Sequence, residues 1–219
     1  MDWLIKAVAT ALISYLVPWL LKRVLPEPGG GSSRTVGDVR RFPWGGWILA
    51  LAAAGGLSGI VSGLMGLILG GVANWAVLGA MLGIVQWLFL YGRFDIGPWF
   101  ALASTLGWAT FVFIQPVGHL TWAIVGVIVG LLQWLGMQRR IPAAFWWVPA
   151  NALAWFVAGM TGLAVSMVVA AATNFGIGWI VGWTCVGGVG AVILAIPLNW
   201  MFKHDHGARK AAAHPQEGQ

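Results

Sequence analysis

The chain has 219 residues and a formal net charge of +6; 59% of its residues are hydrophobic and only 8% are charged. Soluble globular domains carry about 25% charged residues, so this composition excludes a soluble globular fold and indicates a chain that turns apolar surface toward lipid. The only cysteine is Cys185, which excludes an intrachain disulfide and a thiolate metal cluster.

Residues 1–25 are predicted to form an N-terminal helix that either spans the membrane or lies in its interface. Polar residues recur along 3–21 at every fourth position and form one stripe, which suits an interfacial helix: Lys6, Thr10, Ser14, Pro18 and Lys22. Trp3 and Trp19 lie near opposite ends of the segment, like interface anchors, and favour spanning. We favour the spanning helix, and the interfacial one stays open as an alternative.

Residues 26–43 follow as a basic loop rich in Pro and Gly, a composition typical of irregular structure. The loop is predicted to lie in the cytoplasm. The cytoplasmic position of the loop accounts for its basic side chains, which also suit contact with anionic lipid headgroups or with a cytoplasmic partner.

Six strongly apolar segments come next, each close to the roughly 20 residues that a membrane helix needs: 47–69, 75–91, 99–114, 121–137, 145–168 and 175–198. They make 44–200 a six-helix transmembrane domain. The predicted fold class is therefore all-α, a polytopic bundle of 6–7 spans. The polar tail 201–219 is expected to be disordered.

The connections between these segments alternate between basic and uncharged. Of the 12 Lys and Arg residues, all except Lys6 lie in four segments: 22–43, 92–98, 138–144 and 199–219. The positive-inside rule therefore places these four in the cytoplasm of a bacterial inner membrane. Topology accounts for the positive charge, and we expect no nucleic-acid partner.

An internal repeat appears when the chain is shifted by 47 residues, which aligns 71–108 with 118–155 without gaps. Hydrophobic bias alone does not match Trp, Gly, Gln and Arg together, so we interpret the two stretches as a duplicated two-helix hairpin. The shift crosses two spans, so both copies keep one orientation and the repeat is parallel. The identical pairs are Gly71/Gly118, Trp75/Trp122, Ala76/Ala123, Gly79/Gly126, Gly83/Gly130, Gln86/Gln133, Trp87/Trp134, Leu88/Leu135, Arg93/Arg140, Trp99/Trp146, Ala103/Ala150, Leu106/Leu153 and Trp108/Trp155.

Glycines at intervals of four residues mark the helix faces that we expect to pack closely, because glycine lets a neighbouring backbone approach. These helix-packing candidates are Gly55, Gly59, Gly63, Gly79, Gly83, Gly126 and Gly130. Helix packing is the main interpretation of the glycines in 55–63, and an oligomer interface or a slot for a flat ligand is the alternative.

Two glutamines follow the repeated glycines on nearly the same helix face. A Gln amide is costly in hydrocarbon unless it finds partners, so Gln86 and Gln133 are expected to bond to the facing helix, at Ser104 or Asn151. These four residues are candidates for helix-packing contacts or for a polar path. Trp87 and Trp134 are expected to pack against Trp108 and Trp155, or to face lipid or a pigment.

The unit Gly-x3-Gly-x2-Gln-Trp, followed by Arg and a Trp-rich helix, resembles a group of uncharacterised multi-spanning bacterial membrane proteins in which such hairpins recur. The resemblance covers 70–160. It implies a fold and a bacterial origin, and it carries no function.

Reactive chemistry is missing from the sequence. None of the six acidic residues lies in a strong span, which disfavours ion-coupled transport. No catalytic constellation or metal site is visible, so we expect no enzyme, no catalytic residue and no metal. His119 is a weak candidate for cofactor binding, with an exposed loop histidine as the simpler interpretation; the sequence implies no particular cofactor.

Three functional hypotheses follow. The first is a non-catalytic scaffold, assembly factor or accessory subunit of a larger membrane complex, with the lipid bilayer, other proteins or a second copy as partners. The second is a carrier or channel for a neutral or lipid-like solute. The third is a pigment- or haem-binding membrane subunit.

Overall fold

The computed structural model describes residues 42–94, 96–139, 141 and 143–213; residues 65–69, 92–94 and 202–213 are described by their backbone alone. The described residues are almost all helical and contain no strand, which confirms the all-α fold class. The predicted N-terminal helix, most of the basic loop and the end of the tail lie outside this part of the chain.

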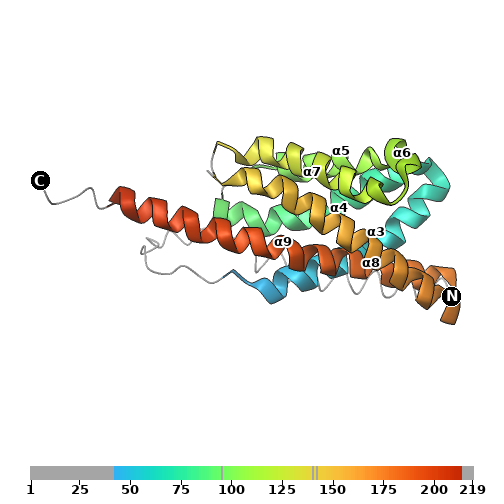
Figure 1. The fold of residues 1–219 in the computed structure, drawn as a ribbon. Coiled ribbons are helices and arrows are strands. Elements are labelled where there is room, and N and C mark those ends of the chain that lie inside the picture. The colour runs from blue at the N-terminus through green and yellow to red at the C-terminus, as the bar shows by residue number, and fades with distance from the viewer. Residues whose placement is uncertain (1–41, 95, 140, 142, 214–219) are drawn as a thin grey trace, which may run out of the picture.

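The predicted apolar segments lie within the observed helices (Figure 1). In chain order these are α3 (Trp44–Leu69), α4 (Gly71–Phe94), α5 (Trp99–Ala109), α6 (Phe111–Ile114), the 3-10 helix η2 (Gln115–Leu120), α7 (Thr121–Met137), the 3-10 helix η3 (Ala144–Trp146), α8 (Trp147–Ala172) and α9 (Phe175–Ala213).

The long helices form a closed ring. Each of α3, α4, α5, α7, α8 and α9 packs against the next one in this order, and α9 returns to pack against α3. Helices on opposite sides of such a ring lie too far apart for their backbones to touch, so large side chains must fill the centre. The largest fully buried side chains meet this need: Trp47, Phe100, Trp108, Trp147 and Trp155.

Five segments of the described chain are long and apolar enough to cross a membrane: Trp44–Leu64, Gly71–Tyr91, Trp99–Met137, Ala144–Ala172 and Phe175–Met201. The third segment runs through α5, α6, η2 and α7 and turns back on itself. The indole N–H of Trp99 donates to the carbonyl oxygen of Leu132 (2.8 Å), so the start of α5 lies beside the end of α7. This continuous segment covers both of the predicted spans 99–114 and 121–137.

Short turns separate the helices. Gly70 alone breaks the chain between α3 and α4, with a φ of 84° that favours glycine. Gly118 (φ 75°) makes the kink inside η2. Asn174 caps α9, because its side-chain oxygen accepts the backbone N–H of Ile177 (3.0 Å).

The prediction of a disordered tail from residue 201 is wrong for its first part. Helix α9 continues to Ala213, a length of 39 residues, and it extends past the other helices in Figure 1. Ala, Lys and Arg, which dominate the end of α9, are strong helix formers, and they extend a helix that is already nucleated.

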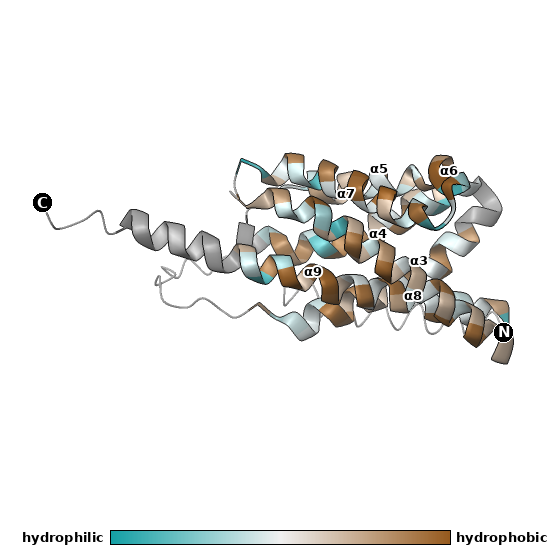
Figure 2. Ribbon diagram, viewed as in Figure 1, coloured by the Kyte–Doolittle hydropathy of each residue, from teal (hydrophilic) through white to brown (hydrophobic). Residues whose placement is uncertain are grey.

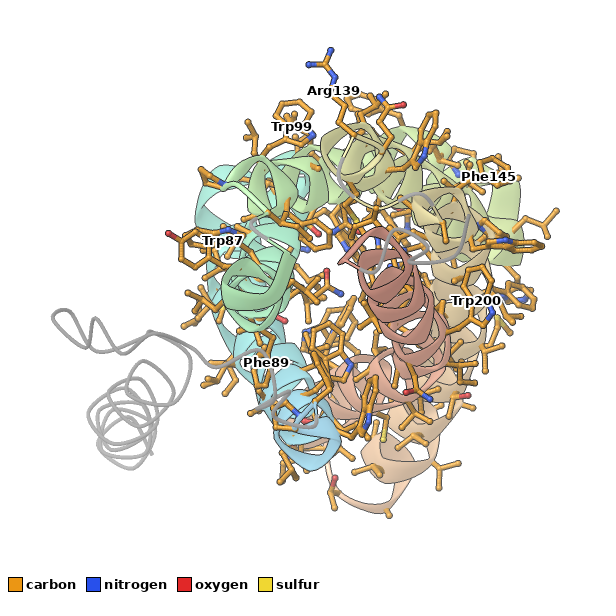
Figure 3. The ribbon with its side chains drawn as sticks, turned by 90° about the vertical axis from the view of Figure 1, so that its left-hand side faces the viewer. Trp87, Phe89, Trp99, Arg139, Phe145 and Trp200 are labelled. Carbon is orange, nitrogen blue, oxygen red and sulfur yellow. The ribbon has the colours of Figure 1, made fainter. Side chains whose placement is uncertain are left out.

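Aromatic side chains ring the end of the bundle that carries Arg139. Figure 3 looks onto this end, where Trp99, Arg139, Phe145 and Trp200 point outward from the ribbon. The exposed part of Phe145 is 60% and that of Trp146 is 58%. Apolar residues recur along the helices in Figure 2, and aromatic belts of this kind are typical of a membrane–water interface.

Candidate functional site

A buried polar cluster joins α4, α5, α7 and α8 inside the ring. The amide nitrogen of Gln133 donates to Oε1 of Gln86 (3.2 Å) and to Oγ of Ser104 (3.0 Å), and Oε1 of Gln133 accepts the indole N–H of Trp147 (2.7 Å). All four side chains are fully buried. Gln133 is therefore the centre of the cluster, with one bond to each of the other three helices.

Trp147 fixes the direction of every bond in this cluster. An indole nitrogen donates and cannot accept, so the oxygen of the Gln133 amide must face Trp147. The Gln133 nitrogen then faces Gln86, which must offer its own oxygen. The amide nitrogen of Gln86 is left buried and without a hydrogen-bond partner among the described residues.

Asn151 and Trp155 form a second polar pair on α8. Nδ2 of Asn151 donates to the backbone oxygen of Trp147 (2.9 Å), and its Oδ1 accepts the indole N–H of Trp155 (3.0 Å). Asn151 is fully buried and uses both ends of its amide within its own helix.

The predicted contacts are therefore met in part. Ser104 is a partner of a repeated glutamine, whereas Asn151 bonds within α8, and the contact between Gln86 and Gln133 was not foreseen. Of the two alternatives for Trp87 and Trp134, packing against Trp108 and Trp155 is not seen among the ring contacts of the described residues, and the other alternative stays a prediction. Trp87 lies against Tyr91, with its N–H on the carbonyl oxygen of Ile96 (2.9 Å), and Trp134 lies against Phe145, because both rings turn toward the outside of the bundle.

The repeated glycines pack within each hairpin. A Cβ on Gly79 would lie 2.6 Å from the carbonyl oxygen of Ser104, and a Cβ on Gly126 would lie 2.5 Å from that of Asn151. Gly83 and Gly130 likewise approach the facing helix, at Ala101 and Ser104 and at Val148 and Asn151. The two glycine pairs thus meet partners that are also 47 residues apart in the sequence.

The glycines of α3 pack against α9. A Cβ on Gly55 would meet backbone atoms of Trp183 and Gly187, and one on Gly59 would lie 3.0 Å from the Trp183 side chain. Gly63 approaches the Trp179 indole, and Gly59 also supplies the carbonyl oxygen that accepts its N–H (3.1 Å). This glycine face is therefore occupied within the chain.

The fully buried side-chain polar atoms that lack a partner among the described residues all belong to one hairpin. They are Oδ1 of Asn74, Nε2 of Gln86 and Nε1 of Trp108, on α4 and α5. The residues 47 positions later are Thr121, Gln133 and Trp155, and each of these makes a side-chain hydrogen bond. Buried polar groups normally find partners, so three exceptions in one hairpin mark it as the incomplete part of the described structure.

An aromatic cluster fills the end of the ring near α6 and the start of α9, away from the polar cluster around Gln133. Trp75 stacks on Phe111, with ring centroids 3.7 Å apart, and Trp108 meets Trp155 edge to face at 5.0 Å. Trp183 lies 5.7 Å from Trp75. The members of the cluster are Trp75, Trp108, Phe111, Trp122, Trp155, Trp179 and Trp183.

A cavity of about 310 Å³ lies among these rings. Its walls come from α4, α6, η2, α7, α8 and α9, and they consist of Trp75, Phe111, Gln115, Gly118, Thr121, Trp122, Gly162, Leu163, Ser166, Trp179, Gly182, Trp183 and Val186. Leu163 is 40% exposed, so the cavity meets the outer surface of the bundle. None of the predicted polar-path residues lines it.

Several residues of the cavity wall carry indole N–H groups. The indole N–H groups of Trp75, Trp122 and Trp183 make no hydrogen bond with the described residues, whereas that of Trp179 is held by Gly59. The wall also includes the uncharged side chains of Gln115, Thr121 and Ser166, and none of the described residues that line it is ionisable. This arrangement suits an uncharged ligand that accepts hydrogen bonds.

His119, the weak cofactor candidate, is exposed on η2 and does not line the cavity. The cavity residues were missed in the sequence because they come from separate helices. The sequence offered one signal: Trp179 and Trp183 are separated by the same number of residues as Trp75 and Gly79 in the repeated unit. No protein-family model, curated protein or solved structure matches the chain.

Proposed function

We propose that the protein is an integral membrane protein that binds a neutral, lipid-like solute in its aromatic cavity and acts on it without catalysis, as a carrier or a receptor. The observation that carries this proposal is the cavity itself: about 310 Å³, walled by aromatic rings and free of ionisable side chains. Ligand sites are typically concave and mainly apolar, with a few polar groups that fix orientation. The buried glutamines, once candidates for a polar path, bond to one another and hold the helices together.

The test is purification from native membranes in mild detergent, followed by mass spectrometry of bound small molecules. Leu163→Trp fills the cavity from its exposed side, and Leu153→Trp on the same helix, also exposed but away from the cavity, is the matched control. We expect a bound lipid-like molecule in the parent protein and in Leu153→Trp, and its loss in Leu163→Trp. A protein that is empty in all three forms would overturn the proposal.

The cavity is proposed to lie in the half of the membrane away from the cytoplasm. Residues 92–98, 138–144 and 199–219 carry the basic side chains, while η2 and the turn before α9 have no Lys, Arg, Asp or Glu. With the antiparallel arms of Trp99–Met137 each crossing once, the chain from α3 onward would cross a bacterial inner membrane six times. Residues 3–21, which lie outside the described structure, would add a seventh span.

Reporter fusions test this topology. Fusions after Gly71, Gly118 and Thr173 are expected to report the periplasm, and fusions after Arg41, Arg93 and Arg140 the cytoplasm. One inversion among the last three would refute the arrangement.

We also propose that the hairpins α4–α5 and α7–α8 arose by duplication. The sequence identities support this origin, and so do the glycine contacts at positions 47 residues apart on both sides of each helix pair.

A role as an accessory subunit is the second candidate. Helix α9 has 39 residues, or about 58 Å at 1.5 Å per residue, whereas the hydrocarbon core of a bilayer is about 30 Å thick. Its last turns would project beyond the end of the bundle that carries the basic residues, where a partner protein would bind them. Protein co-purification with the full chain, lost on truncation after Met201, would support this role. A coloured preparation would favour a pigment instead.

A further inference from the structure

We infer that the ligand of the aromatic cavity is a planar, uncharged ring that bears carbonyl oxygens, of the quinone type. This inference rests on the proposed function. It is drawn from the hydrogen-bond balance of the cavity wall, from its lack of charge and from the shape of its walls.

The first observation is a surplus of indole donors in one place. Elsewhere in the ring, Trp47 donates to Ala191, Trp147 to Gln133 and Trp155 to Asn151, whereas the buried N–H of Trp108, a member of the aromatic cluster, has no partner among the described residues. In the cavity wall, the N–H groups of Trp75, Trp122 and Trp183 have no acceptor among the described residues. An indole nitrogen can only donate, so a ligand that satisfies these groups must bring acceptors.

The second observation is that nothing in the wall can pair with a charge. Among the described residues, no Lys, Arg, His, Asp or Glu lines the cavity. A carboxylate or phosphate would be an unpaired anion in an apolar environment, which is costly. A carbonyl oxygen is a neutral acceptor, so it can satisfy an indole N–H without bringing a charge into the cavity.

The third observation is the shape and size of the space. Aromatic rings pair with other flat rings in offset-stacked or edge-to-face arrangements. The cavity volume of about 310 Å³ is at the lower end of the range typical of small-molecule sites, so it suits a substituted ring better than a whole lipid. A hydrocarbon tail would leave past Leu163, which lines the cavity and is also exposed on the outer surface.

The test measures binding of two probes to the full chain in lipid nanodiscs, at equal probe-to-lipid ratios, by isothermal titration calorimetry. The probes are 2-decyl-1,4-benzoquinone and decylbenzene, which share a flat ring and a tail and differ in the carbonyl oxygens. We expect the quinone to bind about tenfold more tightly or better, since a net hydrogen bond is worth roughly fivefold in affinity and more than one donor is available.

Tryptophan-to-phenylalanine variants identify the donors, because they keep a ring and remove the N–H. Trp75→Phe, Trp122→Phe and Trp183→Phe are made singly, and at least one should lower quinone affinity about fivefold while leaving decylbenzene affinity unchanged. Trp179→Phe is the matched control from the same wall, because its N–H is already held by Gly59. This control should leave the ratio of the two affinities unchanged.

The outcomes separate the two proposals. Equal affinity for both probes, or variants that weaken both equally, would overturn the carbonyl inference and leave the cavity as a general apolar site. Tighter binding of decyltrimethylammonium than of the quinone would overturn it in favour of a cation–π cage. Failure of all probes to bind would refute the proposed function itself.

Discussion

The hairpins α4–α5 and α7–α8 share their glycines, their glutamine and their inner tryptophans, yet they differ in how their polar groups are satisfied. In the second hairpin, Gln133 and Trp155 are hydrogen-bonded. In the first, the amide nitrogen of Gln86 and the indole nitrogen of Trp108 are buried without partners among the described residues.

Two substitutions between the hairpins account for this difference. Phe100 stands where the second hairpin has Trp147, and a phenyl ring offers no N–H to orient the Gln86 amide. Ser104 stands where the second has Asn151, whose carbonyl oxygen receives the Trp155 indole. Gln133 and Trp155 of the second hairpin thus both have partners, whereas Gln86 and Trp108 of the first each keep a buried donor without a partner among the described residues. Buried polar groups that lack a hydrogen-bond partner, as these do, are expected at functional sites.

The largest expected effect is a difference in the stability lost when each of the two glutamines is replaced. Gln133→Leu leaves Trp147, Ser104 and the oxygen of Gln86 without their bonds, and we expect it to lower the free energy of unfolding by about 3 kcal/mol. Gln86→Leu breaks one bond and removes an unpartnered amide, so we expect a loss of about 1 kcal/mol or less. Unfolding in mixed detergent micelles, followed by circular dichroism, measures both; equal losses would contradict the asymmetry.

The glycine contacts are predicted to be symmetric. Gly79→Ala and Gly126→Ala each place a methyl group within 2.6 Å of a backbone oxygen on the facing helix, and each should cost about 2 kcal/mol through overpacking. Gly188→Ala is the control, because its Cβ would meet only the Ala52 side chain at 3.5 Å. The same unfolding assay should give a change within about 1 kcal/mol for this control, on the stabilising side. A loss for only one of the repeated glycines would show that the hairpins differ in packing as well.

The helices and the contacts within each hairpin could be predicted from the sequence. Runs of apolar residues locate the helices, and glycines four residues apart mark the faces of α4 and α7 that touch the next helix, because both signals are local. The partnership of a repeated glutamine with Ser104 followed from the same reasoning.

Contacts that depend on closure of the ring could not be predicted. Gln86 meets Gln133 because α4 and α7 both turn that face toward the centre, a fact of the whole bundle and not of either helix. The cavity is similarly formed where side chains from separate helices meet at one end of the ring and leave space between them. The sequence pattern of a single helix cannot predict such a gap.

A smaller effect is expected for the paired inner tryptophans. Trp155→Phe removes the indole that bonds to Asn151 and should cost about 1 kcal/mol more than Trp108→Phe, which removes an N–H without a partner. Both rings are buried and both variants lose the same ring volume, so packing costs cancel to first order in the difference. Unfolding free energies of the two variants test this, and a larger loss for Trp108→Phe would mean that its N–H has a partner after all.

The smallest expected effect is the coupling energy between each inner tryptophan and the polar residue four positions before it. This energy measures the difference between the two hairpins most directly. A double-mutant cycle with Trp155→Phe and Asn151→Ala should give a coupling energy of about 1 kcal/mol, because the two side chains share a hydrogen bond of 3.0 Å. The equivalent cycle with Trp108→Phe and Ser104→Ala should give a coupling near zero, since Ser104 accepts from Gln133 and not from Trp108. Because each cycle subtracts the single-variant losses, cavity and packing terms common to both hairpins drop out. Similar couplings in the two cycles would mean that the N–H of Trp108 is satisfied as that of Trp155 is, and would contradict the difference between the hairpins.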